Sequence, residues 1–253
     1  MKIIAIINQK GGVGKSTTAL SIGAGLSLKG RKVLFIDLDA QGNLSHTLRA
    51  NSAGQPIPSA MDVLSASASL AQAIQQTPQG DVVAASPALA GADTVITATG
   101  KEYRLKEALE PVKAHYDYVV IDTPPALGIL TVNALAACTG CIIPAQADIY
   151  SLQGISQLYG TIRAVQRYCN PSLQVMGILL TRYNGRAIIG REIAEMIEDT
   201  AKQLDTKLYE ARIRECTPIK ESQAVRENIF AYAPKSNAAA DYNMLLDELL
   251  REE

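Results

Sequence analysis

The sequence predicts an α/β fold, with a mostly parallel, twisted sheet and helices on both faces. Short apolar segments alternate with segments of helical periodicity along the whole chain. The first apolar segment also runs directly into a glycine-rich loop and then into a helix. Such alternation is typical of parallel strands joined by crossover helices. The 253 residues, 47% of them hydrophobic, are expected to form a single domain over residues 1–253.

The expected elements follow one another in order. The strands cover residues 2–8, 32–37, 81–85, 118–122, 141–145, 175–181 and 208–213. The helices cover residues 16–29, 60–76, 101–115, 129–137, 151–167, 189–204, 220–228 and 238–251. Residues 51–59, rich in Pro and Ser, are expected to form a surface excursion. Residues 123–147 carry no charge, but their prolines favour a buried helix and strand over a membrane span.

The segment Lys10-Gly11-Gly12-Val13-Gly14-Lys15-Ser16-Thr17 joins the first strand to the first helix. This is the context of a phosphate-binding loop, so we expect a P-loop NTPase fold. Glycines let backbone N–H groups approach an anion, and the helix N-terminus attracts the same phosphates. Lys15 can neutralise the β- and γ-phosphates, and Ser16 offers a hydroxyl to Mg²⁺.

Three acidic side chains follow expected strands. Asp37 and Asp39 come after residues 33–36, and Asp122 comes after residues 118–121. Ligands in such folds lie at the carboxyl ends of the strands. An aspartate that ends an apolar strand downstream of a P-loop holds Mg²⁺ directly or through water. The sequence therefore predicts a site for a nucleotide with Mg²⁺, and the family resemblance described next implies that the nucleotide is ATP.

The loop departs from the ordinary pattern, because Gln9 stands where a glycine is usual and Lys10 adds a second lysine. This K-G-G-x-G-K-[ST] form resembles the deviant Walker A motif of the ParA/MinD ATPase superfamily. Residues 36–43 are similar to the ParA D-x-D-P-Q-G-N segment, with Ala40 in place of proline, and residues 122–125 resemble its Walker B and switch segment. Residues 144–146 and 179–183 also resemble that family, so the similarity covers nearly the whole chain.

The resemblance implies a role for each matching residue. Lys15 binds phosphate, Lys10 reaches the nucleotide of a partner subunit, and Asp39 orients the attacking water; these three are the expected catalytic residues. The expected nucleotide contacts are Lys10, Gly11, Gly12, Val13, Gly14, Lys15, Ser16 and Thr17, with Thr17 at the α-phosphate. Ser16, Asp37 and Asp122 are expected to hold Mg²⁺. The family's Pro-x-Asn at the adenine is replaced here by Arg214-Glu215-Cys216, which makes Arg214 and Cys216 the candidates by position.

The resemblance further implies a weak ATPase that dimerises with ATP and then binds double-stranded DNA without sequence preference. Such a protein is cytoplasmic, associates with the nucleoid in its ATP state, and partitions a plasmid, chromosome or mobile element with a ParB-like stimulating partner. The net charge of −1 requires a local or dimer-created DNA patch, and two Phe with no Trp disfavour base stacking. Candidate contacts with DNA phosphate are Arg186, Lys220 and Arg226, and Arg191 is a further candidate. Arg186 is favoured because Asn184-Gly185-Arg186 resembles the family's D-x-R loop, although residues 182–226 hold nine Lys/Arg against eight Asp/Glu.

Three alternatives remain open at this point. The first is a MinD-like protein, which cycles on membranes through a basic C-terminal helix. Residues 236–253 carry five acids and one base. We therefore expect that helix to pack on the domain without membrane contact. An iron–sulfur carrier P-loop ATPase is supported by Cys138 and Cys141 alone, which we interpret as small core residues. A scaffold that binds ATP without hydrolysis is disfavoured by Asp39.

Overall fold

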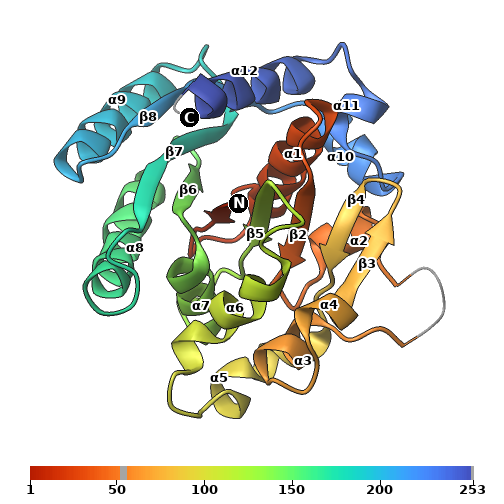
Figure 1. Ribbon diagram of the computed structural model, residues 1–253. Helices are drawn as coiled ribbons and strands as arrows, with labels where there is room; N and C mark the ends of the chain where they lie inside the picture. The colour runs from red at the N-terminus through yellow and green to blue at the C-terminus, as the bar shows by residue number, and fades with distance from the viewer. Residues whose placement is uncertain (52–55, 252–253) are drawn as a thin grey trace.

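One eight-stranded sheet organises the chain in the computed structural model, which describes residues 1–51 and 56–251 (Figure 1). The strand order is β3-β4-β2-β5-β1-β6-β7-β8, and every neighbouring pair is parallel except β3 with β4. The strands are β1 (Lys2–Ile6), β2 (Val33–Asp37), β3 (Ile74–Thr77), β4 (Gly80–Val83), β5 (Tyr118–Asp122), β6 (Gly140–Ala145), β7 (Gln174–Tyr183) and β8 (Leu208–Arg214). The expected mostly parallel α/β fold is confirmed.

Helices cover both faces of the sheet. One face packs against α1 (Lys15–Leu28), α2 (Asn43–Thr47), α10 (Thr217–Ala224), α11 (Ile229–Tyr232) and α12 (Asn237–Arg251). The other packs against α3 (Ala60–Leu64), α4 (Leu70–Ala73), α5 (Ala92–Val95), α6 (Arg104–Leu109), α7 (Ile129–Ala137), α8 (Ile149–Tyr168) and α9 (Ile188–Gln203). Three short 3₁₀ turns complete the set, η1 (Pro87–Gly91), η2 (Lys101–Tyr103) and η3 (Glu110–Val112).

The central strand β1 explains why the expected strands read as continuous apolar runs. Ile3, Ala5 and Ile7 belong to one core, whereas Ile4 and Ile6 belong to the other. Successive side chains of a strand point to opposite faces, so a strand covered on both sides is apolar throughout. The sheet therefore buries two cores, one on each face.

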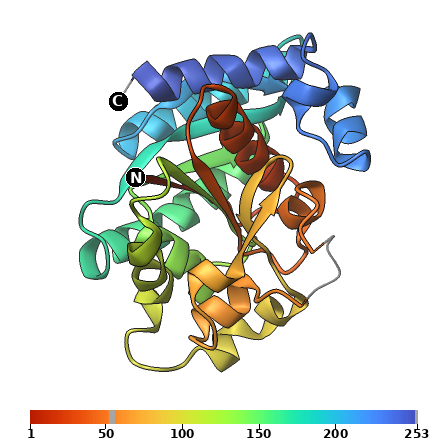
Figure 2. The same cartoon turned by 45° about the vertical axis from the view of Figure 1, so that its right-hand side comes forward.

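Helix α1 lies unusually close to the sheet, and this fixes the loop at its start. A Cβ at Gly23 would come within 2.1 Å of the Phe35 ring, and one at Gly25 would come equally close to Leu246 of α12. Only glycine permits both contacts. Figure 2 shows α12 packed beside α1. Packing on β2 and α12 thus anchors the helix whose N-terminus faces the ligand.

Residues 60–76 are not the single helix that the sequence predicts. They form α3 and α4, and then β3, which pairs antiparallel with β4. Two capping boxes start the helices, one from Ser59 to Asp62 and one from Ser69 to Gln72. Ala66 between them has a positive φ of 61°, which ends the first helix. The expected helix over residues 101–115 is likewise broken into η2, α6 and η3, and the one over 220–228 begins earlier, at Thr217. The expected surface excursion over residues 51–59 includes residues 52–55, which lie outside the described residues.

The C-terminal helix packs on the domain, as predicted. Tyr242, Leu245, Leu246 and Leu249 are buried in the core shared with α1 and β8. Met244, next to this buried apolar stripe on the same helix, is 52% exposed. Across the described residues, no helix combines the length and the apolar character that crossing a membrane requires.

Candidate nucleotide-binding site

A cavity of about 470 Å³ lies at the carboxyl ends of the central strands. Strand β1 lies between β5 and β6 there, which is the kind of position where open α/β sheets bind ligands. The cavity wall comes from the glycine-rich loop, the start of α1, the segment after β2, helix α2 and α10. The lining residues are Gly11, Gly12, Gly14, Lys15, Ser16, Thr17, Leu20, Asp39, Gln41, Asn43, His46, Thr47, Pro125 and Gln223.

The start of α1 is open to an anion. Gly14 precedes the helix in the left-handed conformation, with φ of 83°, and no side chain caps the first turn. The first turn also carries no acidic residue. The first N–H groups of a helix lack intrahelical acceptors, and the helix dipole favours negative charge beside them. The loop therefore fits a phosphate chain.

Three polar side chains brace this loop. The Asn8 carboxamide oxygen accepts from the Lys10 backbone N–H at 2.9 Å. The Gln146 amide donates to the Gly12 carbonyl at 3.2 Å, and the Thr181 hydroxyl donates to the Val13 carbonyl at 2.9 Å. Asn8 and Gln146 lie just after β1 and β6, whereas Thr181 lies inside β7. Gln146 and Thr181 belong to the segments 144–146 and 179–183 that resemble the family, so Asn8 is the one that the sequence analysis did not single out.

The two lysines of the loop occupy different positions. Lys15 is buried, with 7% of its surface exposed, and its ammonium donates to the Lys10 carbonyl at 3.2 Å. Burial lowers the pKa of Lys15, and the charges of Asp122 and Asp39 partly oppose that shift. Lys10 does not line the cavity, and its ammonium pairs with Asp148, the N-cap residue of α8. Although partial burial of Asp148 acts in the opposite direction, the hydrogen bond from Lys10 lowers its pKa.

The three predicted aspartates meet at this edge. Asp37 and Asp122 are register partners on β2 and β5, and both are fully buried. Asp37 accepts from the Ser45 N–H at 2.8 Å and from the Ser45 hydroxyl at 2.7 Å, while its other oxygen accepts from the Asp39 N–H at 3.1 Å. These bonds fix α2 and the intervening loop relative to β2. Ser45 is therefore a positioning residue that the sequence analysis missed.

Asp122 differs from Asp37 in having no such bonds. Both of its carboxylate oxygens are buried, and neither has a hydrogen-bond partner among the described residues. Burial, followed by the charge of Asp37, raises its pKa well above the ordinary range. Ser16 and Lys15 lie near enough to oppose this shift in part, without a well-formed hydrogen bond to either oxygen. A buried, unpartnered carboxylate beside a serine hydroxyl is suited to a hydrated Mg²⁺ ion, so these residues fit the predicted metal.

Asp39 lies on the cavity wall at the centre of a short turn. Its side chain accepts from the Gln41 N–H at 3.0 Å, and its carbonyl accepts from the Gly42 N–H at 2.8 Å. Gly42, with φ of 63°, then leads into α2. Because Asp39 lines the cavity, its carboxylate is placed where it could orient a water.

The burial of Asp37 makes a prediction for stability. Burial, opposed in part by its Ser45 bonds, raises the pKa of Asp37 from 3.8 to about 6. As pH rises from about 4 to about 6, the unfolded chain loses this proton first, so ionisation costs the folded state about 3 kcal/mol by neutral pH. Asp37→Asn should therefore raise the nucleotide-free melting temperature at pH 7 by about 5–10 °C, and calorimetry between pH 4 and 7 measures it. The gain should shrink toward pH 4; an equal gain at every pH would contradict this origin.

The candidate adenine residues are placed away from the cavity wall. The Arg214 guanidinium pairs with Asp241 of α12 at 2.6 Å, and the Arg214 N–H also donates to that carboxylate at 3.0 Å. Cys216 is the N-cap residue of α10. Neither residue lines the 470 Å³ cavity, whereas Gln223, further along α10, does. Their contact with a base stays a prediction.

The candidate DNA contacts are exposed but differ in their surroundings. Arg186 follows β7, and its side chain has no bonded partner among the described residues. Lys220 on α10 lies 3.8 Å from Glu215, and Arg226 just after α10 bonds to His46. Arg191 is exposed on α9. These side chains therefore do not form one continuous unpaired cluster.

Cys138 and Cys141 lie in the core that α7 and α8 cover. Both are buried free thiols, and burial raises the pKa of each, that of Cys141 to about 12. Buried neutral thiols of this kind are small core residues. Among the described residues, these two cysteines belong to no group of three His, Cys, Asp or Glu side chains that could hold a metal ion.

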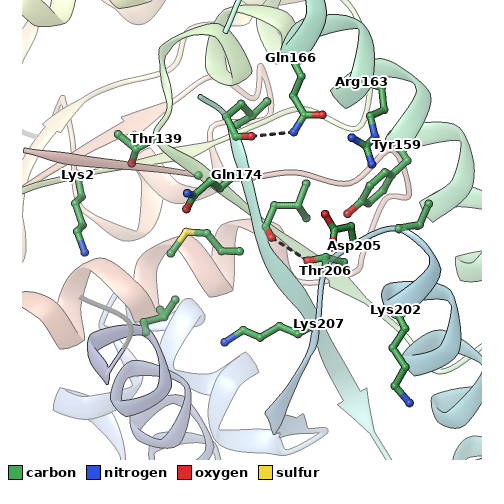
Figure 3. Close-up of a pocket in the computed structure, with 16 residues that line it drawn as sticks. Lys2, Thr139, Tyr159, Arg163, Gln166, Gln174, Lys202, Asp205, Thr206 and Lys207 are labelled. Atoms are coloured by element: carbon green, nitrogen blue, oxygen red, sulfur yellow. Dashed lines mark hydrogen bonds between the residues drawn. The ribbon is translucent and has the colours of Figure 1, made fainter. Parts of the chain in front are cut away.

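A larger hollow of about 950 Å³ lies at the opposite, amino-terminal edge of the sheet (Figure 3). Its lysines, Lys2, Lys202 and Lys207, point in different directions and do not converge on one point (Figure 3). Lys202 pairs with Glu198 and Asp199 of its own helix. This hollow therefore lacks the focused positive charge of the glycine-rich loop.

Comparison with known proteins agrees with this geometry. Residues 1–175 match a family model described as an AAA domain. The chain is 40% identical over 251 residues to the sporulation initiation inhibitor protein Soj of Bacillus subtilis, covering 98% of each chain. It is 36% identical to the chromosome partitioning protein ParA of Myxococcus xanthus, covering all of this chain and 89% of the other. A solved cobyrinic acid a,c-diamide synthase from Mycobacterium smegmatis, with bound ADP and magnesium, superposes with a TM-score of 0.86 at 34% identity, covering all of this chain and 95% of the other.

Proposed function

Because this chain belongs to the Soj/ParA family of partition ATPases, we propose that it is a DNA-anchored switch that ATP assembles and hydrolysis releases. The ATP-bound form is a homodimer that holds double-stranded DNA on the nucleoid without sequence preference. A ParB-like partner stimulates hydrolysis and so frees the protein from DNA. The uncapped start of α1, with the buried Lys15 beside it, is the observation that carries the nucleotide part of this proposal.

The residues of the cavity divide the work of phosphoryl transfer. The loop N–H groups and Lys15 bind the phosphate chain, and Asp39 orients water for attack on the γ-phosphorus. Ser16 and Asp122 hold Mg²⁺, with Asp37 setting the position of α2. When bound, Mg²⁺ neutralises phosphate charge as the bond to the leaving group breaks. The products are ADP and inorganic phosphate.

Two observations support an ATP-dependent homodimer. Lys10 does not enter its own cavity but pairs with Asp148, so its charge is available at the molecular surface once that pair opens. Ile149 and Tyr150, directly after Asp148, are 57% and 74% exposed. Exposed apolar side chains next to a ligand site are suited to association. A second subunit docked on this edge would bury them and receive Lys10.

The DNA part of the proposal rests on exposed basic residues and not on overall charge. The chain has a net charge of −1, so attraction to phosphate must come from a few placed side chains, doubled in a dimer. Arg186 and Arg226 are the best placed, because neither pairs with a carboxylate among the described residues. Packing of α12 on α1 and β8 leaves its apolar stripe engaged within the domain, which favours a DNA-based cycle over a membrane-based one.

Co-sedimentation with non-specific duplex DNA tests this function. The protein is mixed with DNA at one moderate salt concentration, with ATP, with ADP or without nucleotide. We expect pelleting with DNA only in ATP, and faster phosphate release when a ParB-like partner from the same replicon is added. Equal binding in all three states, or none in any, would overturn the DNA switch and leave the ATP site intact.

A further inference from the structure

The segment from Gln223 to Arg226, at the end of α10, is bonded to two walls of the nucleotide cavity. The Gln223 side-chain amide donates to the Thr17 hydroxyl at 2.8 Å. The Arg226 Nε–H donates to His46 Nε2 at 3.1 Å. Thr17 on α1 and His46 on α2 both line the cavity. A ligand in that cavity therefore meets two side chains that already hold this segment.

Further bonds tie the same segment to α2. The Gln79 amide donates to the Thr47 carbonyl at 2.8 Å and to the Arg226 carbonyl at 3.1 Å. The Arg49 guanidinium donates to the Val225 carbonyl at 3.2 Å. Since α2 directly follows the turn that carries Asp39, a movement of that turn is passed to the backbone of Arg226. We call the set Gln79, His46, Gln223 and Arg226 the α2–α10 junction.

Arg226 itself is held in place but not neutralised. Its φ of 58° lies in the left-handed region, which is strained for any residue with a Cβ and persists only where neighbours enforce it. Its side chain is exposed and bonds to a histidine, with no carboxylate partner among the described residues. The two Nη groups are thereby left to bind an anion. Lys220, by contrast, lies beside Glu215.

We propose that His46 is a positioning residue that aims Arg226 at a DNA phosphate and makes this contact depend on the nucleotide. His46 accepts the Arg226 bond through Nε2, so it acts as neutral imidazole with its proton on Nδ1. The inference rests on the proposed ATP-dependent binding of DNA. It adds a route, through His46 and Gln223, by which nucleotide in the cavity affects the contact of Arg226 with DNA.

A coupling of this kind acts in both directions. If ATP raises the affinity for DNA by some factor through the α2–α10 junction, DNA must raise the affinity for ATP by the same factor. A folding defect that lowers the fraction of active protein weakens DNA binding with ATP and with ADP alike and leaves this factor unchanged, whereas loss of the junction lowers the factor. The size of this factor in each direction is therefore the quantity to measure.

The experiment compares the full-length wild type with His46→Ala, His46→Gln, Arg226→Ala, the His46→Ala/Arg226→Ala double variant, and Arg31→Ala as control. Arg31 is an exposed arginine before β2, at the amino-terminal edge of the sheet. DNA dissociation constants are measured with ATP and with ADP at several salt concentrations. ATP dissociation constants are measured with and without DNA, and melting curves check folding.

We expect Arg226→Ala and His46→Ala each to weaken ATP-state DNA binding about three- to tenfold. Each should also lower the salt slope by about one for every DNA phosphate that the variant no longer neutralises. The double variant should be no weaker than Arg226→Ala alone, because His46 acts through Arg226. His46→Gln keeps a hydrogen-bond acceptor and should restore most of the binding. Arg31→Ala should match the wild type.

Two results would overturn the inference alone. Both assume that the wild type still binds DNA with ATP. In the first, the double variant loses the sum of the two single losses. In the second, His46→Ala keeps the salt slope and the coupling factor of the wild type. A wild type that binds no DNA in any nucleotide state would refute the proposed function and this inference together. The wild-type measurement thus separates the two failures.

Discussion

Lys15→Ala is expected to reduce ATP hydrolysis at least about 100-fold and to weaken ATP binding in parallel. Lys15 is a buried cation beside the loop, and removing one such electrostatic group from a phosphoryl-transfer site costs about 3–4 kcal/mol. The loop N–H groups remain but cannot replace a full positive charge. Nucleotide titration and phosphate release, both with DNA present, measure the two effects.

The same substitution should change the apo protein as well. Lys15 is one of the few groups that lower the pKa of Asp122, so its removal raises that pKa further. Lys113→Ala is the matched control, because Lys113 is 58% exposed and its ion pair is with Glu110 in its own turn. A Lys15→Ala protein that melts normally yet keeps phosphate release within about threefold of wild type would contradict the role of this lysine.

Asp39→Ala is expected to retain ATP and the dimer while losing about 100-fold in hydrolysis. Asp39 lines the cavity, but the proposed phosphate contacts are the loop N–H groups and Lys15, so ATP binding should not depend on Asp39. Without an oriented water the γ-phosphate persists, and the dimer and its DNA should persist with it. Sedimentation of the protein with ATP, followed over time, reports the trapped dimer.

Asp199→Ala, which removes a 71% exposed acid of α9, serves as the control for Asp39→Ala. Rapid ATP turnover that continues in Asp39→Ala would remove Asp39 from the mechanism. The two variants should also differ from each other. Lys15→Ala should fail to assemble, whereas Asp39→Ala should assemble and fail to separate. A shared outcome would mean that nucleotide binding and hydrolysis are not separate steps in this protein.

The sequence predicted the central part of the fold well, because buried parallel strands leave a strong signal. Strands β1, β2 and β5 are continuous apolar runs; β1 leads into the glycine-rich loop, and β2 and β5 each end in a buried aspartate. The glycine-rich loop was equally predictable from the sequence, since strand, loop and helix are contiguous in the chain. Local patterns of this kind need no knowledge of distant residues.

The β3–β4 edge of the sheet was harder to predict from the sequence. Residues 60–76 read as one helical period, yet Ile74 and its neighbours pair with β4 because a hairpin closes through the turn at Gly80. The serines that begin the two short helices, Ser59 and Ser69, carried the missed signal, since each stands three residues before an Asp or Gln. Strand pairing outweighed helix periodicity here.

The side chains that brace the site could not be assigned from local pattern. Thr181 bonds to a carbonyl 168 residues away, and Gln146 bonds to one 134 residues away. Arg214 matched a base-contact position along the chain, but its charge is engaged by Asp241, which α12 brings from the end of the sequence. Contacts made by the tertiary fold decide these roles.

The pairing of Lys10 with Asp148 bears on which encounters between subunits succeed. A partly exposed ion pair is worth at most about 1 kcal/mol, so it is a weak restraint that any stronger counter-charge removes. A neighbour loaded with ATP offers one more phosphate than a neighbour loaded with ADP, and the exchange of partners is correspondingly more favourable. In the proposed dimer, each subunit would therefore distinguish an ATP-bound partner from an ADP-bound one before hydrolysis takes place. Such discrimination when two subunits first associate would keep ADP-bound subunits monomeric and free to diffuse.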